Sequence, residues 1–426
     1  MIGIAFSGGG TRAAAFSYGV LQHLQATEMA GADRTLFDNI RYMSGVSGGS
    51  VTAAYFGLKG KSAFTDYRSA FLDRDAEAYL RTSAIRPTNL LRVASGGVND
   101  RNSFGRWVDE NLFKGATFGD LNRNGQITTW ISAADIFNRL PFTFEQETFR
   151  ALCSDLDALP IAEAVAASAA VPVVFSPIVL EAHGPRCRYD RPNWLTTAAF
   201  NTEASATLRA YADAIENYRD PEKMRFVKLL DGGITDNFGL TSLAIARARS
   251  QTPFGPLSPD NAVRLDRMMF IVVNSGRGNN ADWANEVRGP SGFELVMAVT
   301  DTATVSAMRE GFNSFRLGME RWQQALIDFR CSLSRAQIRE YGRDPSNFNC
   351  KALKLFVGEI RFDQLDRQTQ LALDAVPTRL KLEPDEVDLT VNAGRRAAAI
   401  NPTIRSFLSH AGGISAGNRR FIEPDD

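Results

Sequence analysis

Length, composition and charge set the first limits on this chain. Its 426 residues, 44% of them hydrophobic, are enough to bury a large core, and no apolar run is long enough to span a bilayer. The 48 basic and 48 acidic residues cancel, so no overall field favours binding to nucleic acid. Residues 1–6 lack the basic and apolar segments of a signal peptide, and we expect a soluble, cytoplasmic protein.

The N-terminal part predicts two consecutive strand–helix units. A short apolar run over residues 2–6 ends in Ser7-Gly8-Gly9-Gly10, as a buried parallel strand before a turn does, and a helical pattern follows over 11–30. A second run over 40–43 leads into Gly45-Val46-Ser47-Gly48-Gly49 and a helix over 48–58. This order predicts a parallel sheet covered by helices.

The rest of the chain continues this pattern and then becomes more helical. Further strand candidates are residues 126–134, 173–180, 226–230 and 268–274, the last of which we expect to complete the main sheet. Beyond residue 278 we predict a long helix over 293–329, a strand over 353–362 and a helical tail over 384–408. The expected packed face of the long helix is Leu295, Val299, Val305, Phe312, Phe315, Trp322 and Leu326. No linker interrupts the chain, so we expect residues 279–426 to pack on the same core as residues 1–278.

Ser47 has the surroundings of a catalytic nucleophile. A serine hydroxyl attacks only when a sharp turn exposes it, a base accepts its proton and donors bind the oxyanion that forms. Small residues on both sides of Ser47 permit such a turn between a strand and a helix. Gly8, Gly9 and Gly10 end the neighbouring strand, so their N–H groups are candidates for the oxyanion hole, with Arg12 beside them.

Two choices of base remain open from the residues alone. Asp231 ends the strand over 226–230 and precedes two glycines, which places its carboxylate at the same edge of the sheet as Ser47. Of the three histidines, His23 falls within the first helix and His183 in a polar loop. The order Ser47, Asp231, His410 would suit an α/β-hydrolase triad, although that arrangement usually has several strands before the serine. The alternative is a Ser47/Asp231 dyad.

Four blocks of this sequence resemble the signature of the patatin-like phospholipase family. They are Ser7-Gly8-Gly9-Gly10-Thr11-Arg12, Gly45-Val46-Ser47-Gly48-Gly49, Asp231-Gly232-Gly233, and the stretch from Ala167-Ser168-Ala169 to Phe175-Ser176-Pro177. The chain departs from the common pattern at Thr11 and at Asp236-Asn237, where many members have two asparagines. Neither departure removes a catalytic group.

The resemblance implies a fold, an activity and a set of roles. It implies a three-layer α/β/α sandwich with a mostly parallel sheet, a catalytic domain over 1–278 and a mainly helical C-terminal extension. The implied activity is that of a phospholipase A or lysophospholipase acting on lipid at a membrane or micelle surface, without histidine, calcium or another cofactor. Carried over by position, Ser47 is the nucleophile, Asp231 the base, and Gly8, Gly9 and Gly10 the oxyanion loop beside Arg12.

Two other functions are compatible with parts of the pattern. A lipid-binding scaffold could keep the fold without turnover, although such a protein has no chemical need for Ser47 and Asp231. Nucleotide binding by the glycine loop is disfavoured because neither GxxxxGK[ST] nor GxGxxG occurs.

Cysteines and aromatic residues give two further expectations. The pairs Cys153 with Cys187 and Cys331 with Cys350 would suit two disulfides in an exported protein, whereas four free thiols would suit a cytosolic one. A loop rich in large apolar residues is a candidate for membrane contact, with core packing as the alternative; its members are Phe137, Leu140, Pro141, Phe142 and Phe144.

Overall fold

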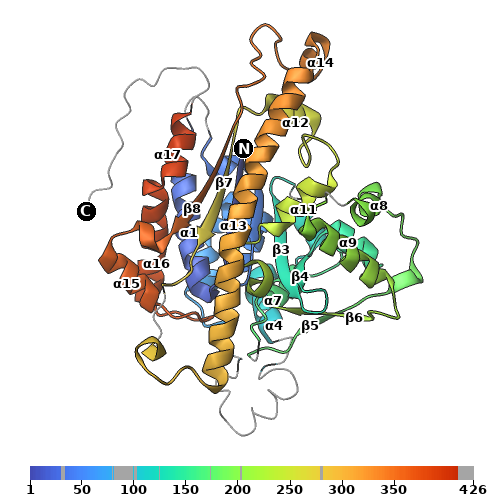
Figure 1. The fold of residues 1–426 in the computed structure, drawn as a ribbon. Coiled ribbons are helices and arrows are strands. Elements are labelled where there is room, and N and C mark those ends of the chain that lie inside the picture. The colour runs from blue at the N-terminus through green and yellow to red at the C-terminus, as the bar shows by residue number, and fades with distance from the viewer. Residues whose placement is uncertain are drawn as a thin grey trace.

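A mixed sheet with mostly parallel strands forms the centre of the molecule (Figure 1). The computed structural model describes residues 1–29, 34–78, 80, 99, 103–123, 125–172, 174–201, 204–278 and 282–410. The strand order is β5-β6-β3-β2-β1-β7-β8, and β4 pairs with β3. The strands are β1 (Ile2–Phe6), β2 (Ile40–Gly45), β3 (Thr128–Asp135), β4 (Leu140–Thr143), β5 (Ile178–Glu181), β6 (Phe226–Leu230), β7 (Arg267–Asn274) and β8 (Lys354–Arg361).

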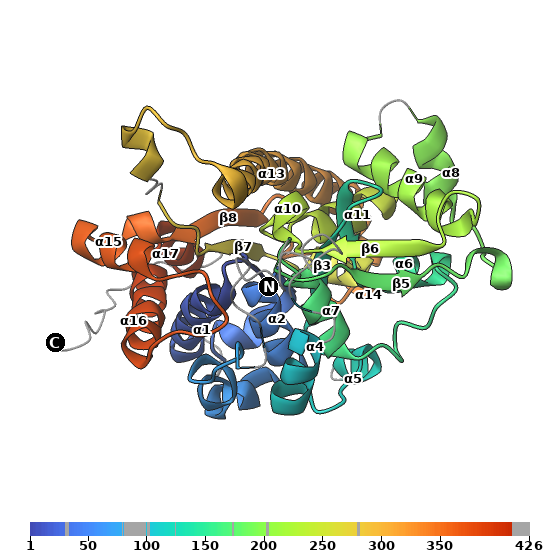
Figure 2. The same ribbon diagram turned by 90° about the horizontal axis from the view of Figure 1, so that it is seen from below.

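Helices cover both faces of this sheet (Figure 2). The helices α1, α2, α7 and α16 lie on one face, and α10, α11 and α13 lie on the other. The α-helices are α1 (Gly10–Ala26), α2 (Gly48–Lys59), α4 (Ser103–Val108), α5 (Phe118–Arg123), α6 (Gln146–Ala151), α7 (Ile161–Ser168), α8 (Asn193–Phe200), α9 (Ala206–Arg219), α10 (Gly233–Asp236), α11 (Thr241–Arg249), α12 (Pro259–Arg264), α13 (Gly292–Ser332), α14 (Arg335–Glu340), α15 (Arg367–Ala375), α16 (Pro384–Ile400) and α17 (Pro402–Ser409). Short 3-10 or π turns are η1 (Phe37–Asn39), η2 (Gly60–Thr65), η3 (Arg68–Leu72), η4 (Asp109–Phe113), η5 (Gly184–Arg186), η6 (Asp282–Asn285) and η7 (Phe362–Gln364). The predicted three-layer α/β/α architecture is confirmed.

The parallel strands bring their carboxyl ends to one edge of the sheet. β1 pairs in parallel with β2 and β7, and β2 pairs in parallel with β3. All five residues of β1 are buried, which explains its continuous apolar sequence. The strands β4, β5 and β6 are antiparallel to their neighbours. The motifs at residues 7–10 and 45–49 therefore follow adjacent strands at the same edge.

The C-terminal part contributes directly to the same core. β8 pairs in parallel with β7 along its whole length, so the prediction that residues 268–274 complete the sheet is wrong. The helices α16 and α1 cross with their backbones in close contact. A side chain on Gly19 would meet the Val391 carbonyl, and one on Gly394 would meet the Phe16 carbonyl. This contact needs glycine on both helices. The boundary at residue 278 between a catalytic domain and a C-terminal extension stays a prediction.

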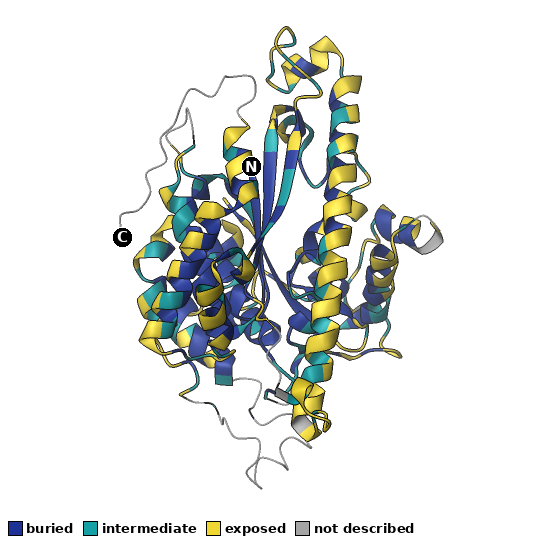
Figure 3. Cartoon of the chain, turned by 60° about the vertical axis from the view of Figure 1, so that its left-hand side comes forward, coloured by how far each residue is buried: buried dark blue, intermediate teal, exposed yellow. Residues whose placement is uncertain are grey.

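The predicted packed face of the long helix is correct only in its second half. Phe315, Trp322 and Leu326 are buried, whereas Leu295, Val299 and Val305 are exposed. A helix of 41 residues is about 60 Å long, more than twice the span of an eight-residue strand, so α13 extends past the sheet. Figure 3 shows the exposed surface along this helix. No described helix is both long and apolar enough to cross a bilayer.

Two shorter predictions also need correction. The strand expected over 173–180 is confined to β5, and residue 173 lies outside the described part. Pro172 and Pro177 lack the N–H groups that strand pairing requires. In the proposed membrane loop, Leu140, Phe142 and Phe144 are buried, because β4 pairs with β3 and turns them into the core. Of the five residues proposed for this loop, Phe137 is the one whose side chain is largely exposed.

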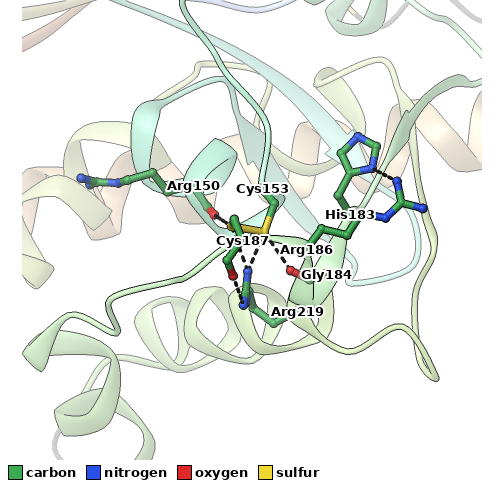
Figure 4. Close-up of a disulfide and its surroundings, with 7 residues drawn as sticks. All are labelled: Arg150, Cys153, His183, Gly184, Arg186, Cys187 and Arg219. Atoms are coloured by element: carbon green, nitrogen blue, oxygen red, sulfur yellow. Dashed lines mark hydrogen bonds between the residues drawn. A yellow bond between two sulfur atoms is a disulfide. The ribbon is translucent and has the colours of Figure 1, made fainter.

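Both expected cysteine pairs form disulfides. Cys153 is bonded to Cys187 and Cys331 to Cys350, across 34 and 19 residues of sequence. In Figure 4 the guanidinium of Arg219 lies against the first disulfide, donating to Cys153 Sγ at 2.8 Å and to the Cys187 carbonyl at 3.3 Å. The helix α9 is thereby joined to the segments on both sides of β5.

Reduction of the disulfides is expected to destabilise the protein. Closing loops of this length stabilises a fold by about 3–4 kcal/mol each on the loop-entropy estimate. A thermal melt with a thiol reductant should therefore show a midpoint several degrees lower than one without it. Thiol titration of the denatured, unreduced chain should find no free cysteine among the four in the sequence. Four reactive thiols in the purified protein would contradict this pairing.

Candidate active site

Ser47 occupies a strained turn between β2 and α2. Its φ of 52° lies in the left-handed region that side chains rarely adopt, and the residue is only 7% exposed. A side chain at Gly48 would meet the Gly10 carbonyl, and one at Gly49 would meet the carbonyls of Phe6 and Ser7. The small residues of the motif are therefore required by the close approach of the two strand–helix turns, as the sequence pattern predicts.

Ser168, at the end of α7, holds this turn in place. Its Oγ accepts a hydrogen bond from the Ser47 N–H at 2.9 Å and donates one to the Ser132 carbonyl at 2.6 Å. Its own carbonyl accepts from the Gly232 N–H at 3.1 Å. One buried serine thus connects the Ser47 turn, β3 and the turn that carries Asp231. The sequence included Ser168 in a family block but assigned it no role.

Replacing Ser168 by alanine is expected to loosen the Ser47 turn. The change leaves a buried N–H and a buried carbonyl unpaired, which costs about 1–3 kcal/mol of folding free energy. Because the Ser47 turn loses its brace, kcat should also fall, by about tenfold, with little change in KM. Ser242→Ala is the matched control, since Ser242 is also buried and bonds the Ser132 hydroxyl at 3.2 Å without touching Ser47. Equal kcat losses in both variants would contradict a positioning role.

Asp231 is a buried carboxylate on the turn that packs against Val46, next to Ser47. It follows β6, is 8% exposed, and accepts a hydrogen bond from the Gly233 N–H at 2.8 Å. Burial raises the pKa of Asp231 to about 6, and the hydrogen bonds from the Gly233 N–H and the Ser47 side chain limit that rise. A carboxylate with this pKa is ionised near neutral pH and is more basic than a carboxylate in water.

The glycine loop lies against Ser47 on the other side. A side chain on Gly8 would lie 3.2 Å from Ser47 Cβ, and the Gly8 N–H donates to Asn237 Oδ1 at 3.1 Å. Gly9 and Gly10 have φ values of 140° and 63°, and their N–H groups bond to no other described residue. Gly10 begins α1, whose positive N-terminal end therefore faces the site.

Arg12 is buried beneath this loop. Its Nη1 donates to the Val376 carbonyl at 2.8 Å, and its Nη2 would lie 3.2 Å from a side chain on Gly9. Burial, with a smaller contribution from the nearby Arg277, lowers the pKa of Arg12 to about 9, so the guanidinium remains charged at neutral pH. The Thr11 N–H donates to the Arg379 carbonyl at 2.7 Å. The C-terminal part thus fixes the glycine loop through residues 376 and 379.

The three histidines lie elsewhere. His23 bonds Thr27 within the first helical segment, and His183 bonds Arg186 beside the first disulfide (Figure 4). The His410 ring packs 5.5 Å from the Phe356 ring, and its carbonyl accepts from Arg267 at 2.6 Å. Arg267 begins β7, about 20 Å along the strand from the edge where Ser47 lies. The alternative triad with His410 is therefore incompatible with this geometry.

The structure thus brings together most of the residues singled out in the sequence. Ser47, Gly8 and Asp231 lie on three turns that Ser168 and Asn237 connect by hydrogen bonds, and Arg12 lies beneath the glycine loop. Sequence reasoning missed the contact of Asn237 with the glycine loop, although its position was noted as a departure from the common pattern. Among the described residues, no cluster of three or more His, Cys, Asp or Glu side chains could hold a metal ion.

Comparisons with known proteins identify the family. Among solved structures, human GIVD cytosolic phospholipase A2 aligns with this chain at a TM-score of 0.43 and 14% sequence identity. The alignment covers 96% of this chain and 63% of the phospholipase chain. The chain thus spans less than two thirds of that protein's length. A search of curated proteins by sequence gave no match. The family model described as patatin-like phospholipase matches residues 4–244, more than half of the chain. The chain therefore belongs to the patatin-like phospholipase family.

Proposed function

We propose that this protein hydrolyses carboxylic esters of acyl lipids through a Ser47/Asp231 dyad. The observation that carries the proposal is that Ser168 joins the Ser47 turn to the turn of the buried Asp231, by accepting hydrogen bonds from the Ser47 N–H at 2.9 Å and the Gly232 N–H at 3.1 Å. Family membership supports lipid hydrolysis in general terms. Phospholipids and lysophospholipids, presented at a membrane or micelle surface, are the substrates that fit this membership.

In the proposed first step, Ser47 Oγ attacks the carbonyl carbon of the ester while its proton moves to Asp231. The tetrahedral intermediate then collapses, and the leaving alcohol takes the proton back from Asp231 as the C–O bond breaks. An acyl-Ser47 ester remains. Asp231 next accepts a proton from water, whose oxygen attacks the acyl carbon, and collapse releases the fatty acid and restores the Ser47 hydroxyl.

The oxyanion of both intermediates would be bound by the glycine loop. The Gly8 N–H is already engaged by Asn237, so we assign the donor role to the N–H groups of Gly9 and Gly10. The positive end of α1 and the charged Arg12 beside Gly9 add favourable potential at the same place. Gly8 contributes by keeping the loop close to Ser47.

The two disulfides bear on where this chemistry takes place. Disulfides persist in oxidising compartments and are rare in the reducing cytosol. Because all four cysteines are paired, we propose an exported location in preference to the cytoplasm.

Labelling by a fluorophosphonate tests the dyad directly. Ser47 Oγ should displace fluoride from the probe and form a stable phosphonyl ester, whereas a lipid-binding scaffold without turnover should not react. Wild-type protein should be labelled and Ser47→Ala should not. Ser50→Ala, which removes a hydroxyl one turn away, is the control that should still react. Labelling of the Ser47→Ala variant would assign the nucleophile to another residue.

A further inference from the structure

An exposed apolar hollow with a basic rim lies at the turn after β3 and the start of β6. Ile136, Phe137 and Phe226 are 42%, 55% and 49% exposed. Together with Met224 they line a hollow of about 460 Å³, whose remaining lining residues are Lys223, Arg225 and Lys228. Large apolar side chains gathered at one exposed place mark an interaction surface more often than chance exposure does. We call these seven residues the basic hollow.

The fold holds these apolar side chains outward on rigid elements. Asp135 Oδ1 accepts hydrogen bonds from the N–H groups of Phe137 and Asn138 at 3.0 and 3.1 Å, which fixes the turn after β3. Asp135 Oδ2 accepts from the Tyr218 hydroxyl at 2.8 Å. Phe137 is therefore presented by a turn that a buried carboxylate organises.

The alternation of β6 places Phe226 on the solvent side. Val227 and Leu229 point into the core, while Phe226 and Lys228 are exposed. A solvent-facing strand position usually carries a polar residue, and a phenylalanine there leaves a large apolar area in water. An occupant that covers Phe226 and Phe137 together would remove this cost.

The charge on the rim has one sign. Lys223 lies 4.0 Å from Asp220, but Arg225 and Lys228 form no ion pair with any described residue. Three acids lie nearby, Asp220 and Glu222 before the basic hollow and Glu181 opposite Phe226 on β5, but none of them lines it. Since the whole chain has no formal net charge, this cluster of three cations is a local feature. A partner that matches the basic hollow would have an anionic surface with an apolar layer behind it.

The basic hollow lies on an element that leads directly to the candidate active site. β6 starts at Phe226 and ends next to Asp231, so its five residues span about 17 Å. Figure 1 shows β5 and β6 in the lower part of the molecule, and β7, to which β1 is parallel, runs towards that part. The basic hollow and Asp231 therefore lie at opposite ends of one short strand.

We propose that the basic hollow docks the protein on an anionic lipid bilayer. Phe137, Phe226 and Ile136 enter the boundary between headgroups and acyl chains, while Arg225 and Lys228 lie against lipid phosphates. The inference rests on the proposed function for the choice of a lipid surface as partner. It adds the docking face and the sign of the headgroup charge.

Vesicle sedimentation with the catalytically disabled Ser47→Ala protein tests the proposal separately from hydrolysis. The protein should bind vesicles of phosphatidylcholine mixed with phosphatidylglycerol in equal parts, and should bind pure phosphatidylcholine much more weakly. Adding Arg225→Gln and Lys228→Gln should lower the partition coefficient on the mixed vesicles about 30-fold, since each basic residue near such a surface contributes about fivefold. Phe137→Ser should lower it about tenfold on both vesicle types.

Matched variants at the far end of the molecule are the control. Arg335→Gln with Arg339→Gln removes two exposed cations from α14, at the upper end in Figure 1, and should leave binding unchanged. Equal loss in this control, or equal binding to both vesicle types, would overturn the proposal. If the variants of the basic hollow instead convert a dimer to a monomer in light scattering without vesicles, the occupant is a second copy of the chain. With Ser47 intact, the Arg225→Gln, Lys228→Gln variant should hydrolyse a soluble short-chain ester at the wild-type rate. If the wild-type protein does not hydrolyse that ester, the proposed function is contradicted but the docking proposal is not.

Discussion

Ser47→Ala is expected to abolish ester hydrolysis while leaving the fold intact. The variant loses the atom that forms the acyl ester, and the remaining site can only bind substrate and polarise its carbonyl. In serine hydrolases, loss of the nucleophile lowers kcat by about 10⁶-fold. The Ser47 side chain is small, and the N–H that bonds Ser168 at 2.9 Å is unaffected by the change.

The measurement is the steady-state rate on a p-nitrophenyl acyl ester and on a phospholipid, compared with wild type and Ser50→Ala. Ser50 Oγ donates to the Ser47 carbonyl at 2.6 Å, so Ser50→Ala removes a neighbouring hydroxyl without removing the nucleophile. Circular dichroism should confirm equal folding of all three proteins. Retention of more than a trace of hydrolysis by Ser47→Ala would exclude the acyl-Ser47 mechanism.

Asp231→Asn is expected to separate activity from stability. The amide cannot accept the Ser47 proton, so kcat should fall by about 10⁴-fold, comparable with the loss of a general base elsewhere. In the wild type, kcat/KM should rise about tenfold per pH unit below pH 6 and level off above it, because the base acts only when ionised and the pKa of Asp231 is about 6. His410→Ala should leave this profile unchanged.

The same substitution should stabilise the folded protein at alkaline pH. The pKa of Asp231 is higher in the folded chain, about 6, than its ordinary value of 3.8, so the folded state binds the proton more tightly. Stability from this group is therefore greatest below pH 4 and is lost as the pH rises to about 6. Replacing the carboxylate by an amide should gain up to about 3 kcal/mol at pH 8 and nothing at pH 3.

Thermal melts of wild type and Asp231→Asn at several pH values check this expectation. The gain in unfolding temperature should grow between pH 4 and pH 6 and remain constant above. Asp236→Asn serves as the control, because Asp236 ends the short helix α10 that follows Asp231 and accepts a hydrogen bond from the Thr241 N–H at 2.7 Å without contacting Ser47. A variant less stable than wild type at pH 8 would show that Asp231 is not the costly buried charge inferred here.

Docking through the basic hollow would complement this chemistry. Ser47 and Asp231, to which we assign the catalysis, are only 7% and 8% exposed, so the proposed site has little surface of its own with which to hold a lipid layer. Contact with a bilayer at Phe137 and Phe226 would hold the substrate layer near the end of β6. Binding and hydrolysis are then separate properties of two neighbouring surfaces.

Several features of the fold and the candidate site could be read from local sequence. Each short apolar run that ends in glycines became a strand at nearly the predicted bounds, because burial on both faces of β1, or on one face of β6, and a sharp turn leave a strong local pattern. The sequence left open whether the four cysteines pair, and the structure shows both disulfides. Ser47 was expected beside the glycine loop because parallel strands align their carboxyl ends, as β1 and β2 do. The same argument fails for Asp231, because β6 runs antiparallel to β3 and reaches the site from beyond the end of that strand.

Other features depended on contacts between distant segments. The place of β8 beside β7, and the burial of only the second half of α13, follow from the size of the sheet and not from the helix pattern itself. The hydrogen bonds from the Ser47 N–H to Ser168 and from the Gly8 N–H to Asn237 join residues more than a hundred positions apart, and no local signal predicts them. His410 was excluded as the base only when the chain placed it at the opposite edge.

The sequence by itself determined the chemistry of the Ser47 turn: a serine between glycines after a buried strand, with an aspartate and a glycine loop at other strand ends. Only the tertiary structure decided how that chemistry is tuned. It buries Asp231 so that its pKa rises to about 6, engages the Gly8 N–H with Asn237, and leaves Phe137 and Phe226 in water. Local sequence sets which groups are available, whereas desolvation and long-range hydrogen bonds exist only once the sheet has assembled.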